Sequence, residues 1–487
     1  MDKQQQPVEL KRSLSFIDAT MLVAGSMIGS GIFIVSADMA RTVGSAGYLI
    51  LLWIVTGVIT VMAALSYGEL AGMMPKAGGQ FVYLERAFGK LVAFVYGWTV
   101  FTVIQTGTIA AVAVAFAKYS AIFFPVLNNE VISVAISEEL KWTVTIGQMY
   151  AMVSIVLLTI INSRGINSGK IIQSTFTFTK LFALFALIVL GIFLGFKYDT
   201  LSQNFSDAWN ASTTTFKDGT LTVIPIAGIA LLGALGSTII NSLFSADAWN
   251  NVTFIAGEIK DPKRNIPRSL FFGTLLVTVI YVLANIAYLS LLPLKGNPLA
   301  TNVHDLGIQF ATNDRVGAAA ASVIFGDAGL YLMACLIMIS TFGCNNGLIL
   351  AGARVYYAMA KEKLFLSKAA EVNSKAVPSN ALWYQCIWAC ALCLTGTYKD
   401  LVSYATFASV LFYIITIIGI FILRKKEPDA ERPYKAFGYP VIPALYILAA
   451  LAICIILVIY DGRNTGFGLV CVATGIPVYY LTVGRKK

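Results

Sequence analysis

Apolar runs separated by short polar segments recur along the whole chain. Most of them reach about 18 residues, the length at which an apolar run is typical of a helix that crosses a lipid bilayer. They show neither the alternation of a half-buried strand nor the single apolar stripe of a helix in a soluble protein. The pattern predicts about twelve spans, at residues 16–40, 48–74, 91–117, 149–162, 171–196, 221–256, 269–293, 330–360, 381–395, 401–423, 441–460 and 466–482.

Composition agrees with this prediction. Hydrophobic residues make up 57% of the 487 residues and charged residues only 12%, against about a quarter charged in a typical soluble domain. A water-soluble fold of this length would have too few polar groups to cover its surface. We therefore expect an all-α, multi-pass membrane protein that has the lipid bilayer as a partner.

The positions of lysine and arginine indicate an orientation. With the N-terminus placed inside, most of the 35 Lys and Arg residues fall in cytoplasmic segments, as positively charged loops usually do. Because an even number of spans returns the chain to its starting side, we expect both termini in the cytoplasm of a cell membrane protein. The formal net charge of +10 then reflects topology, and no nucleic-acid partner is expected.

Side chains suited to catalysis or metal binding are scarce. The single histidine, His304, falls in a predicted external loop, and no paired carboxylates or nucleophile with a base occur within a span. All seven cysteines fall in predicted spans; Cys386, Cys390 and Cys393 share one helical face, but no His or carboxylate accompanies them. The sequence therefore predicts no enzyme, no metal site and no cofactor.

The first span is interrupted near its middle, where residues 25–31 contain three glycines and two serines that oppose a continuous helix. If the helix breaks, the N–H groups of residues 30–32 begin a second half-helix, whose positive dipole end can hold a carboxylate. Carbonyls that end the first half, near Ala24 and Gly25, can accept from an ammonium. The alternative is close helix packing, since Gly25 and Gly29 also have G-x-x-x-G spacing.

A second interruption lies in the sixth span. Residues 241–251 place a run of polar residues and Asp247 inside an apolar stretch too long for one straight crossing. The interruptions lie in spans one and six, five apart, which is the spacing expected of an inverted repeat of five helices with a site at the repeat interface. This spacing favours two broken helices that together bind a zwitterion.

Four ionisable residues need an explanation. Lys180 lies at mid-span, where a charge costs about 2.5 to 3.5 kcal/mol on insertion scales, so we expect a functional role rather than a snorkelling lysine. Asp247 could bind a proton or cation, but we expect it to cap the second half-helix near Asn250. Glu69 and Glu258 lie near predicted cytoplasmic ends. The basic residues expected to pair with them are Lys76, Arg264 and Arg268.

Several motifs resemble, in order, those of a known transporter family. Residues 25–33 resemble the first-helix signature of the amino acid-polyamine-organocation (APC) superfamily, and residues 244–268 resemble the sixth-helix signature of its L-type amino acid transporter (LAT) branch. The second segment contains Trp249-Asn250-Asn251 and Gly257-Glu258. Further matches that extend the resemblance over nearly the whole chain lie at residues 75–83, 345–347, 353–354, 432–434 and 439–440.

The resemblance implies a leucine-transporter-like fold. Two inverted halves of five helices would give alternating access around discontinuous helices 1 and 6, followed by two extra helices. The division that this implies is a cytoplasmic tail at 1–15, the first repeat at 16–196, an external loop at 197–220, the second repeat at 221–423, a cytoplasmic loop at 424–440, and helices 11 and 12 with a cytoplasmic tail at 441–487.

The resemblance also assigns a substrate site. The residues that would hold the substrate carboxylate are Ser26, Gly29, Ser30 and Gly31. The backbone around Phe244 and Ser245 would take the amino group, and Phe244 matches the aromatic gate, with a packing aromatic as the alternative. Asp247 and Trp249 follow in the same gate segment. Candidates for the side-chain pocket are Ile104, Gln105, Asn346 and Phe407.

Lys180 matches the fifth-helix lysine of the sodium-independent LAT branch. By that resemblance its ammonium occupies the place of a sodium ion and ties the first helix to the eighth, near Ser340 or Cys344. The sequence also departs from the family pattern. Ala246 and Ala248 stand where many relatives have an aromatic residue and a glycine. The external loop after span three has no cysteine, so the disulfide-linked heavy subunit of animal relatives is not expected.

Taken with the broken helices, the resemblance predicts a secondary transporter, or permease, of neutral L-amino acids, working as a sodium-independent antiporter. A proton-coupled symporter in which Lys180 or Asp247 titrates, and a polyamine antiporter of the same fold, are the alternatives within carriers. An ion channel is the alternative from another class, although a channel would need a polar pore stripe rather than two isolated breaks.

Overall fold

The computed structural model describes residues 12–135, 141–395 and 398–482, and most of these residues are helical. The predicted tails lie outside the described residues at 1–11 and 483–487. The helices of the first half are α1 (Phe16–Met27), α2 (Gly31–Val43), α3 (Ala46–Met73), α4 (Gln80–Phe88), α5 (Lys90–Thr99), α6 (Gln105–Ser120), α7 (Ile146–Ser163) and α8 (Ile166–Gly195). Those of the second half are α10 (Gly228–Ser245), α11 (Asn251–Phe254), α12 (Pro262–Leu291), α15 (Asp327–Lys361), α16 (Ser379–Cys393), α17 (Tyr398–Lys426), α18 (Val441–Tyr460) and α19 (Gly462–Thr482).

The predicted all-α membrane fold is confirmed. Within the described residues, 11 helical segments are long and apolar enough to cross a membrane. The predicted ninth span corresponds to α16, which has only 15 residues. The first and sixth spans are discontinuous, as α1 is followed by α2 and α10 by α11. Together these segments agree with about twelve spans.

The connecting segments hold more regular structure than the sequence predicted. They contain the helices α9 (Thr200–Ser206), α13 (Val303–Leu306) and α14 (Val316–Phe325), the hairpin of β1 (Glu130–Ala135) with β2 (Lys141–Thr145), and the hairpin of β3 (Ser212–Lys217) with β4 (Thr220–Pro225). The predicted start of the sixth span at Leu221 is wrong, because Leu221 belongs to β4 and the helix begins only at Gly228. Strand β4 contains apolar residues just before α10, so in the sequence it looks continuous with the apolar run of the helix.

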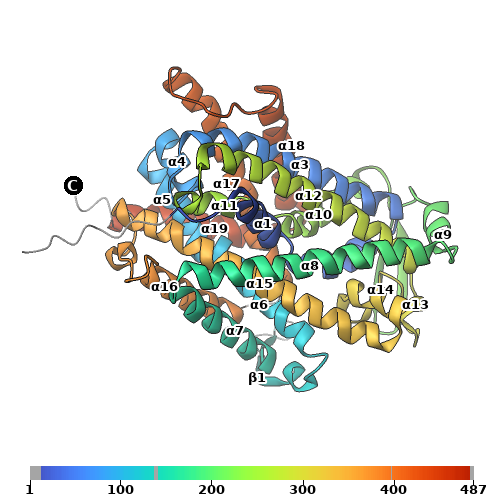
Figure 1. Cartoon of the computed structure of the whole chain (residues 1–487). Coiled ribbons are helices and arrows are strands. Elements are labelled where there is room, and N and C mark those ends of the chain that lie inside the picture. The colour runs from blue at the N-terminus through green and yellow to red at the C-terminus, as the bar shows by residue number, and fades with distance from the viewer. Residues whose placement is uncertain (1–11, 136–140, 396–397, 483–487) are drawn as a thin grey trace, which may run out of the picture.

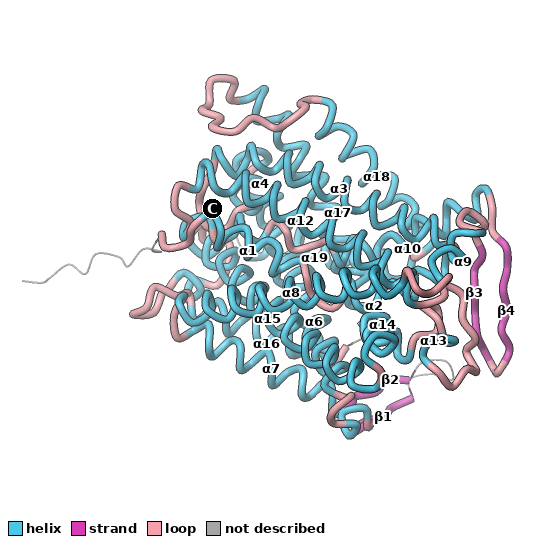
Figure 2. Tube along the Cα trace, turned by 45° about the vertical axis from the view of Figure 1, so that its right-hand side comes forward, coloured by secondary structure: helices cyan, strands magenta, loops and turns pink. Residues whose placement is uncertain are grey.

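The long helices lie side by side (Figure 1). The broken helix α1 packs against the continuous helices α12, α8 and α15, and the broken helix α10 packs against α3, α17 and α18, so each broken helix has continuous neighbours. The β3–β4 hairpin, α9 and α13 lie at one end of the bundle, and α4 lies at the other end (Figure 2).

The start of α1 is fixed by local and long-range contacts. Ser15 forms a capping box with Asp18, in which Asp18 N donates to Ser15 Oγ at 3.2 Å and Ser15 N donates to Asp18 Oδ2 at 2.8 Å. Just before this cap, Ser13 N and Leu14 N donate to Glu258 O at 2.9 and 3.0 Å. Lys260 N in turn donates to Leu14 O at 2.8 Å. The beginning of the first span is thereby bonded to the segment that follows α11.

The third span carries a π-helical turn, Val100–Ile104, between α5 and α6. Thr106 Oγ1 donates to Phe101 O at 2.6 Å, five residues back. Single π-turns inside membrane helices often mark functional sites, and both ends of this one line the cavity described below.

Candidate functional site

The first break separates α1 from α2 over three residues. After α1 ends at Met27, Ile28 N donates to Ala24 O at 3.0 Å and Gly29 N donates to Met27 O at 2.9 Å. α2 then begins at Gly31, with Ser30 as its N-cap residue. The N–H groups of a first helical turn have no partner within their own helix, so this end of α2 is suited to an anion.

The second break separates α10 from α11 over residues 246–250. Ala248 adopts φ 64°, a left-handed conformation that a residue with a Cβ rarely takes unless its surroundings impose it. The chain therefore turns sharply here and leaves Asp247 and Ala248 at the surface of a cavity.

The two breaks touch each other. A Cβ placed on Gly31 would come within 2.7 Å of Ser245 Cβ, so the start of α2 lies against the end of α10. The buried hydroxyl of Tyr281 in α12 lies 3.0 Å from Met27 O and 2.9 Å from Ser245 O. These carbonyls belong to the last residues of α1 and α10. Tyr281 thus joins both interrupted helices, a role that the sequence did not reveal.

Lys180 of α8 is buried against the first break. Its side chain is 1% exposed, and Nζ donates to Gly25 O and Ile28 O, each at 2.6 Å. The side chain does not reach an aqueous interface, in contrast to the snorkelling alternative. The Gly25 carbonyl, considered above as an acceptor for a substrate ammonium, accepts here from the protein's own ammonium.

The eighth span contacts the same turn. In α15, Ser340 Oγ donates to Ile28 O at 3.2 Å, and Cys344 Sγ donates to Ser26 O at 3.0 Å. Lys180 and Ser340 therefore share the Ile28 carbonyl. The fifth and eighth spans are connected through the irregular segment of the first.

The residues assigned to carboxylate binding lie together at this break. A Cβ on Gly29 would meet Cys344 Sγ at 3.1 Å, so Gly29 faces α15 closely. Ser26 Oγ is buried and has no hydrogen-bond partner within the described residues. A buried hydroxyl without a partner is costly, which makes Ser26 a suitable ligand for a bound anion.

Phe244 and Asn346 are also buried, but neither lines the cavity described next. Phe244 lies in the last turn of α10, directly before Ser245. Asn346 Oδ1 accepts from Asn162 Nδ2 at 2.8 Å, which links α15 to α7. The sequence had placed Asn346 among the pocket residues, whereas in this conformation its side chain joins two helices.

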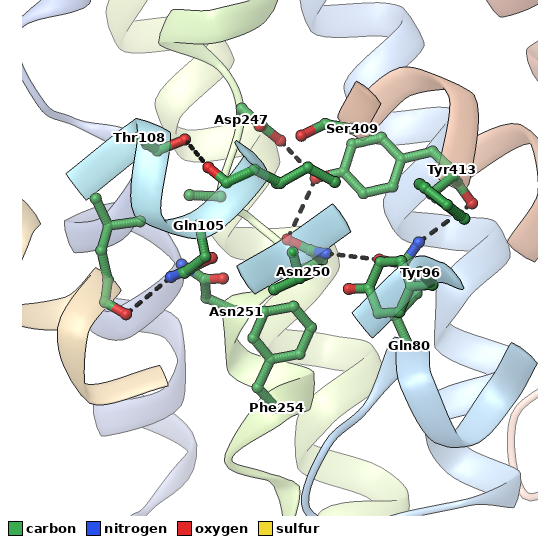
Figure 3. Close-up of a pocket in the computed structure, with 15 residues that line it drawn as sticks. Gln80, Tyr96, Gln105, Thr108, Asp247, Asn250, Asn251, Phe254, Ser409 and Tyr413 are labelled. Carbon is green, nitrogen blue, oxygen red and sulfur yellow. Dashed lines mark hydrogen bonds between the residues drawn. The ribbon is translucent and has the colours of Figure 1, made fainter. Parts of the chain in front are cut away.

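A cavity lined by polar and aromatic side chains lies beside the second break, with about 350 Å³ of empty space when the part open to solvent is included (Figure 3). It is bounded by the α10–α11 break and by α6, α15 and α17. Of the four candidates for a side-chain pocket, Ile104 and Gln105 line it, whereas Asn346 and Phe407 do not. Gln105 Nε2 donates to Leu348 O at 2.8 Å, which fixes its amide at the wall.

Asp247 accepts a hydrogen bond from Tyr413 in α17, with 2.5 Å between Tyr413 Oη and Asp247 Oδ1. The prediction that Asp247 caps the second half-helix is wrong, because the N-cap residue of α11 is Asn250 and no side chain caps that end. The tyrosine lies 166 residues away in the sequence, so local spacing could not have identified it. Trp249 packs edge-on against Tyr67 and tilted against Tyr413, at centroid distances of 4.8 and 5.1 Å.

The polar network continues toward α4. Asn250 Nδ2 donates to Gln80 Oε1 at 3.0 Å, and Gln80 Nε2 donates to Thr416 Oγ1 at 2.9 Å (Figure 3). A second cavity of about 310 Å³, on the side of α3 and α18, also touches Asp247 and Tyr413. Asp247 therefore lies between two cavities.

The acidic residues near the α4 end of the bundle have partners other than those predicted. Glu258 accepts from Arg354 Nε at 3.0 Å, and both side chains are 0% exposed. Glu69 accepts from Arg424 Nε at 2.9 Å and from its Nη2 at 2.6 Å, with Arg432 Nε at 3.3 Å. The predicted pairing with Lys76, Arg264 or Arg268 is wrong, because the fold brings arginines from distant helices closer than the sequence neighbours.

Comparison with known proteins adds independent information. A family model described as Amino acid permease matches residues 14–482. Large neutral amino acids transporter small subunit 2 of Mus musculus is 29% identical over 481 residues, covering 98% of this chain and 82% of the mouse protein. Serine/threonine exchanger SteT of Bacillus subtilis (strain 168) is 28% identical over 481 residues, covering 98% of each chain. The b(0,+)-type amino acid transporter 1 of Mus musculus is 26% identical over 483 residues, covering 98% of this chain and 89% of the relative.

Proposed function

Because the chain belongs to the amino acid permease family, we propose that it exchanges neutral L-amino acids across the cell membrane by alternating access, without sodium. The observation that carries the proposal is the meeting of two broken helices, with α2 beginning where α10 ends. Such a junction offers N–H groups to a carboxylate and carbonyls to an ammonium. The junction therefore complements the carboxylate and the ammonium that all amino acids share.

The substrate carboxylate would bind Ser26, Gly29, Ser30 and Gly31 at the start of α2. The partnerless Ser26 hydroxyl supports this assignment. The ammonium would bind the carbonyl groups at the end of α10, around Phe244 and Ser245. Phe244 and Trp249 would then form the gate, since Phe244 lies in the last turn of α10 and Trp249 lies in the break that follows it.

Sodium independence is supported by the position of Lys180. Its ammonium already bonds two carbonyls of the first break, where a sodium ion would need such oxygen ligands. The covalently attached ammonium of Lys180 would then stabilise the irregular segment between α1 and α2 in the way that a bound sodium ion would. Lys180 and Asp247 would act on the conformational change rather than bind the carboxylate or ammonium of the substrate. Asn346 would contribute to binding the substrate side chain.

We place both termini in the cytoplasm, at the end of the bundle where α4 lies. Basic residues near that end include Arg86, Lys263, Arg354 and Arg424, which pair with carboxylates there, and loops rich in Lys and Arg stay cytoplasmic. The two five-helix repeats would be residues 16–196 and 221–423, with the corrected helix start at Gly228 inside the second.

We further propose that the chain works without a disulfide-linked heavy subunit. One relative carries "small subunit" in its name, which describes an assembly with another chain. In this sequence all seven cysteines lie in predicted spans, so the loop after the third span offers no thiol for such a bond. Purified protein that exchanges amino acids when reconstituted alone would support this proposal.

The test of function is counterflow in liposomes at equal pH on both sides, with choline in place of sodium. Labelled neutral amino acids should enter only when unlabelled ones are inside, and uptake should saturate. Uptake driven by a pH gradient into empty liposomes would instead indicate symport. Entry of labelled putrescine would indicate the polyamine alternative, and single-channel currents a channel.

A further inference from the structure

The π-helical turn of the third span determines which residues of that span face the cavity beside the second break. In a regular α-helix successive residues lie about 100° apart, so Gln105 would lie about 140° around the helix axis from Val100. In the structure Gln105 N donates to Val100 O, five residues back, which places Gln105 one turn beyond Val100 on the same side of the helix. Both residues therefore line the cavity, and Thr108 follows Gln105 on the same wall (Figure 3).

The carbonyl groups of this turn accept hydrogen bonds from side chains. In an α-helix Phe101 O would accept from Gln105 N, but here Phe101 O accepts from Thr106 Oγ1 at 2.6 Å. The next carbonyl, Thr102 O, accepts from Trp388 Nε1 of α16 at 2.9 Å. A carbonyl without a donor is costly within a membrane, and hydroxyl groups and neighbouring helices supply the donors where a spanning helix is irregular. The Thr106 and Trp388 side chains therefore favour the π-turn over a regular helix.

Trp388 contacts the turn from outside the cavity. Its ring stacks on Phe101, with 6.2 Å between the ring centroids and 22° between the ring planes. Phe101 also packs edge-on against Tyr356 of α15 at 5.3 Å, and the Tyr356 hydroxyl donates to Val100 O at 3.4 Å. Trp388, Phe101 and Tyr356 are not among the residues that line the cavity. They can therefore affect a ligand in the cavity only through the turn.

We propose that Trp388 and Thr106 are positioning residues for substrate selection, because they hold the π-turn that directs Gln105 into the cavity. Gln105 is fixed at the wall by the bond from its Nε2 to Leu348 O at 2.8 Å. Without the donors of Trp388 and Thr106, the turn would relax toward an α-helix and Gln105 would rotate away from the wall. This inference rests on the proposed function, with the side chain of the bound amino acid directed into the cavity.

The selectivity between a small and a large amino acid tests this proposal. Liposomes loaded with unlabelled alanine take up labelled alanine, serine or methionine is added outside as a competitor, and the ratio of their half-inhibiting concentrations is measured. Trp388→Phe keeps an aromatic ring against Phe101 and removes the indole N–H, whereas Thr106→Val removes a hydroxyl with little change in shape. Each should change the ratio by about fivefold, the effect of about one neutral hydrogen bond on an equilibrium. A loss of folded protein alone would slow the exchange of every amino acid and leave the ratio unchanged.

Two controls separate positioning from a general effect. Trp383→Phe is the matched control, because Trp383 lies in the same helix, is 37% exposed against 39% for Trp388, and forms no hydrogen bond through its indole N–H within the described residues. Its ratio should equal that of the unchanged protein. In a Gln105→Ala background, Trp388→Phe should change the ratio little further, because a residue that acts through Gln105 loses its effect once that side chain is removed.

An unchanged ratio in both Trp388→Phe and Thr106→Val would overturn the proposal. A change by Trp388→Phe that adds in full to that of Gln105→Ala would overturn it as well. Both results would leave the proposed function intact, since alanine exchange is measured in the same liposomes. Absence of exchange with every neutral amino acid in the unchanged protein would reject the proposed function instead. If Trp388→Phe does not fold, Thr106→Val and its combination with Gln105→Ala decide the question.

Discussion

Removing the hydroxyl of Tyr281 should weaken substrate binding while leaving the fold intact. This hydroxyl lies between Met27 O and Ser245 O, at 3.0 and 2.9 Å, and these carbonyls end the two interrupted helices. Tyr281→Phe keeps the ring, which packs edge-on against Trp53 at 5.3 Å, and removes only the donor. Any effect therefore belongs to the hydrogen bond.

The magnitude follows from leaving the Ser245 carbonyl without this donor, because Met27 O still accepts from Gly29 N at 2.9 Å. Such a loss costs about 1 to 3 kcal/mol, which corresponds to a change of about 5- to 150-fold in an equilibrium constant. Because the Ser245 carbonyl lies where the substrate ammonium is proposed to bind, we expect the apparent affinity for alanine to fall at least about fivefold. Alanine exchange in liposomes measures this affinity, and thermal unfolding in detergent reports the state of the fold.

Tyr288→Phe is the matched control. Tyr288 lies on the same helix, is equally buried, and its hydroxyl has no hydrogen-bond partner within the described residues. Its removal should leave the affinity near that of the unchanged protein. Equal affinities in both variants would refute the idea that Tyr281 positions the two helix ends.

Three further substitutions test other parts of the site. Lys180→Ala removes the Lys180 donor from the Gly25 carbonyl and leaves the Ile28 carbonyl with only the longer bond from Ser340 Oγ, so exchange should slow or affinities at the two membrane faces should diverge by about tenfold; unchanged rates and affinities from each face of oriented liposomes would contradict this. Gly31→Val places side-chain atoms against Ser245 and should abolish alanine binding, measured by thermal shift, whereas Gly466→Val, where a Cβ meets open space, should not. Arg354→Gln leaves Glu258 buried without its ion pair, so the free energy of unfolding should fall by about 3 to 5 kcal/mol; a melting temperature equal to that of the unchanged protein would argue against this.

The features that could be predicted from the sequence are residues that differ in polarity from the apolar span around them. In residues 25–31 and 241–251, small and polar residues interrupt apolar runs, and the structure breaks both helices there. Lys180 stands out in the sequence because a charge at mid-span is costly. The resemblance to the LAT branch of the APC superfamily is confirmed by the family match and by the relatives.

Features created by distant contacts could not be predicted. Tyr281 is one tyrosine in an apolar span, and only the fold places its hydroxyl between two helix ends. The partner of Asp247 is 166 residues away, and that of Glu258 is 96 residues away. The apolar strand β4 looked like the start of a helix because hydrophobicity alone does not distinguish a short strand from a membrane segment.

The bonds between residues 13–14 and 258–260 have a mechanical consequence. Leu14 is hydrogen-bonded to the segment that follows α11. We therefore expect the start of the first span and the second half of the sixth span to move together. To open the bundle at this end, the start of α1 and the segment after α11 must move together, or the hydrogen bonds between them must break first. A reporter fused ahead of Ser13 would therefore pull on the gate itself, whereas the same reporter placed after Thr482 would follow only α19.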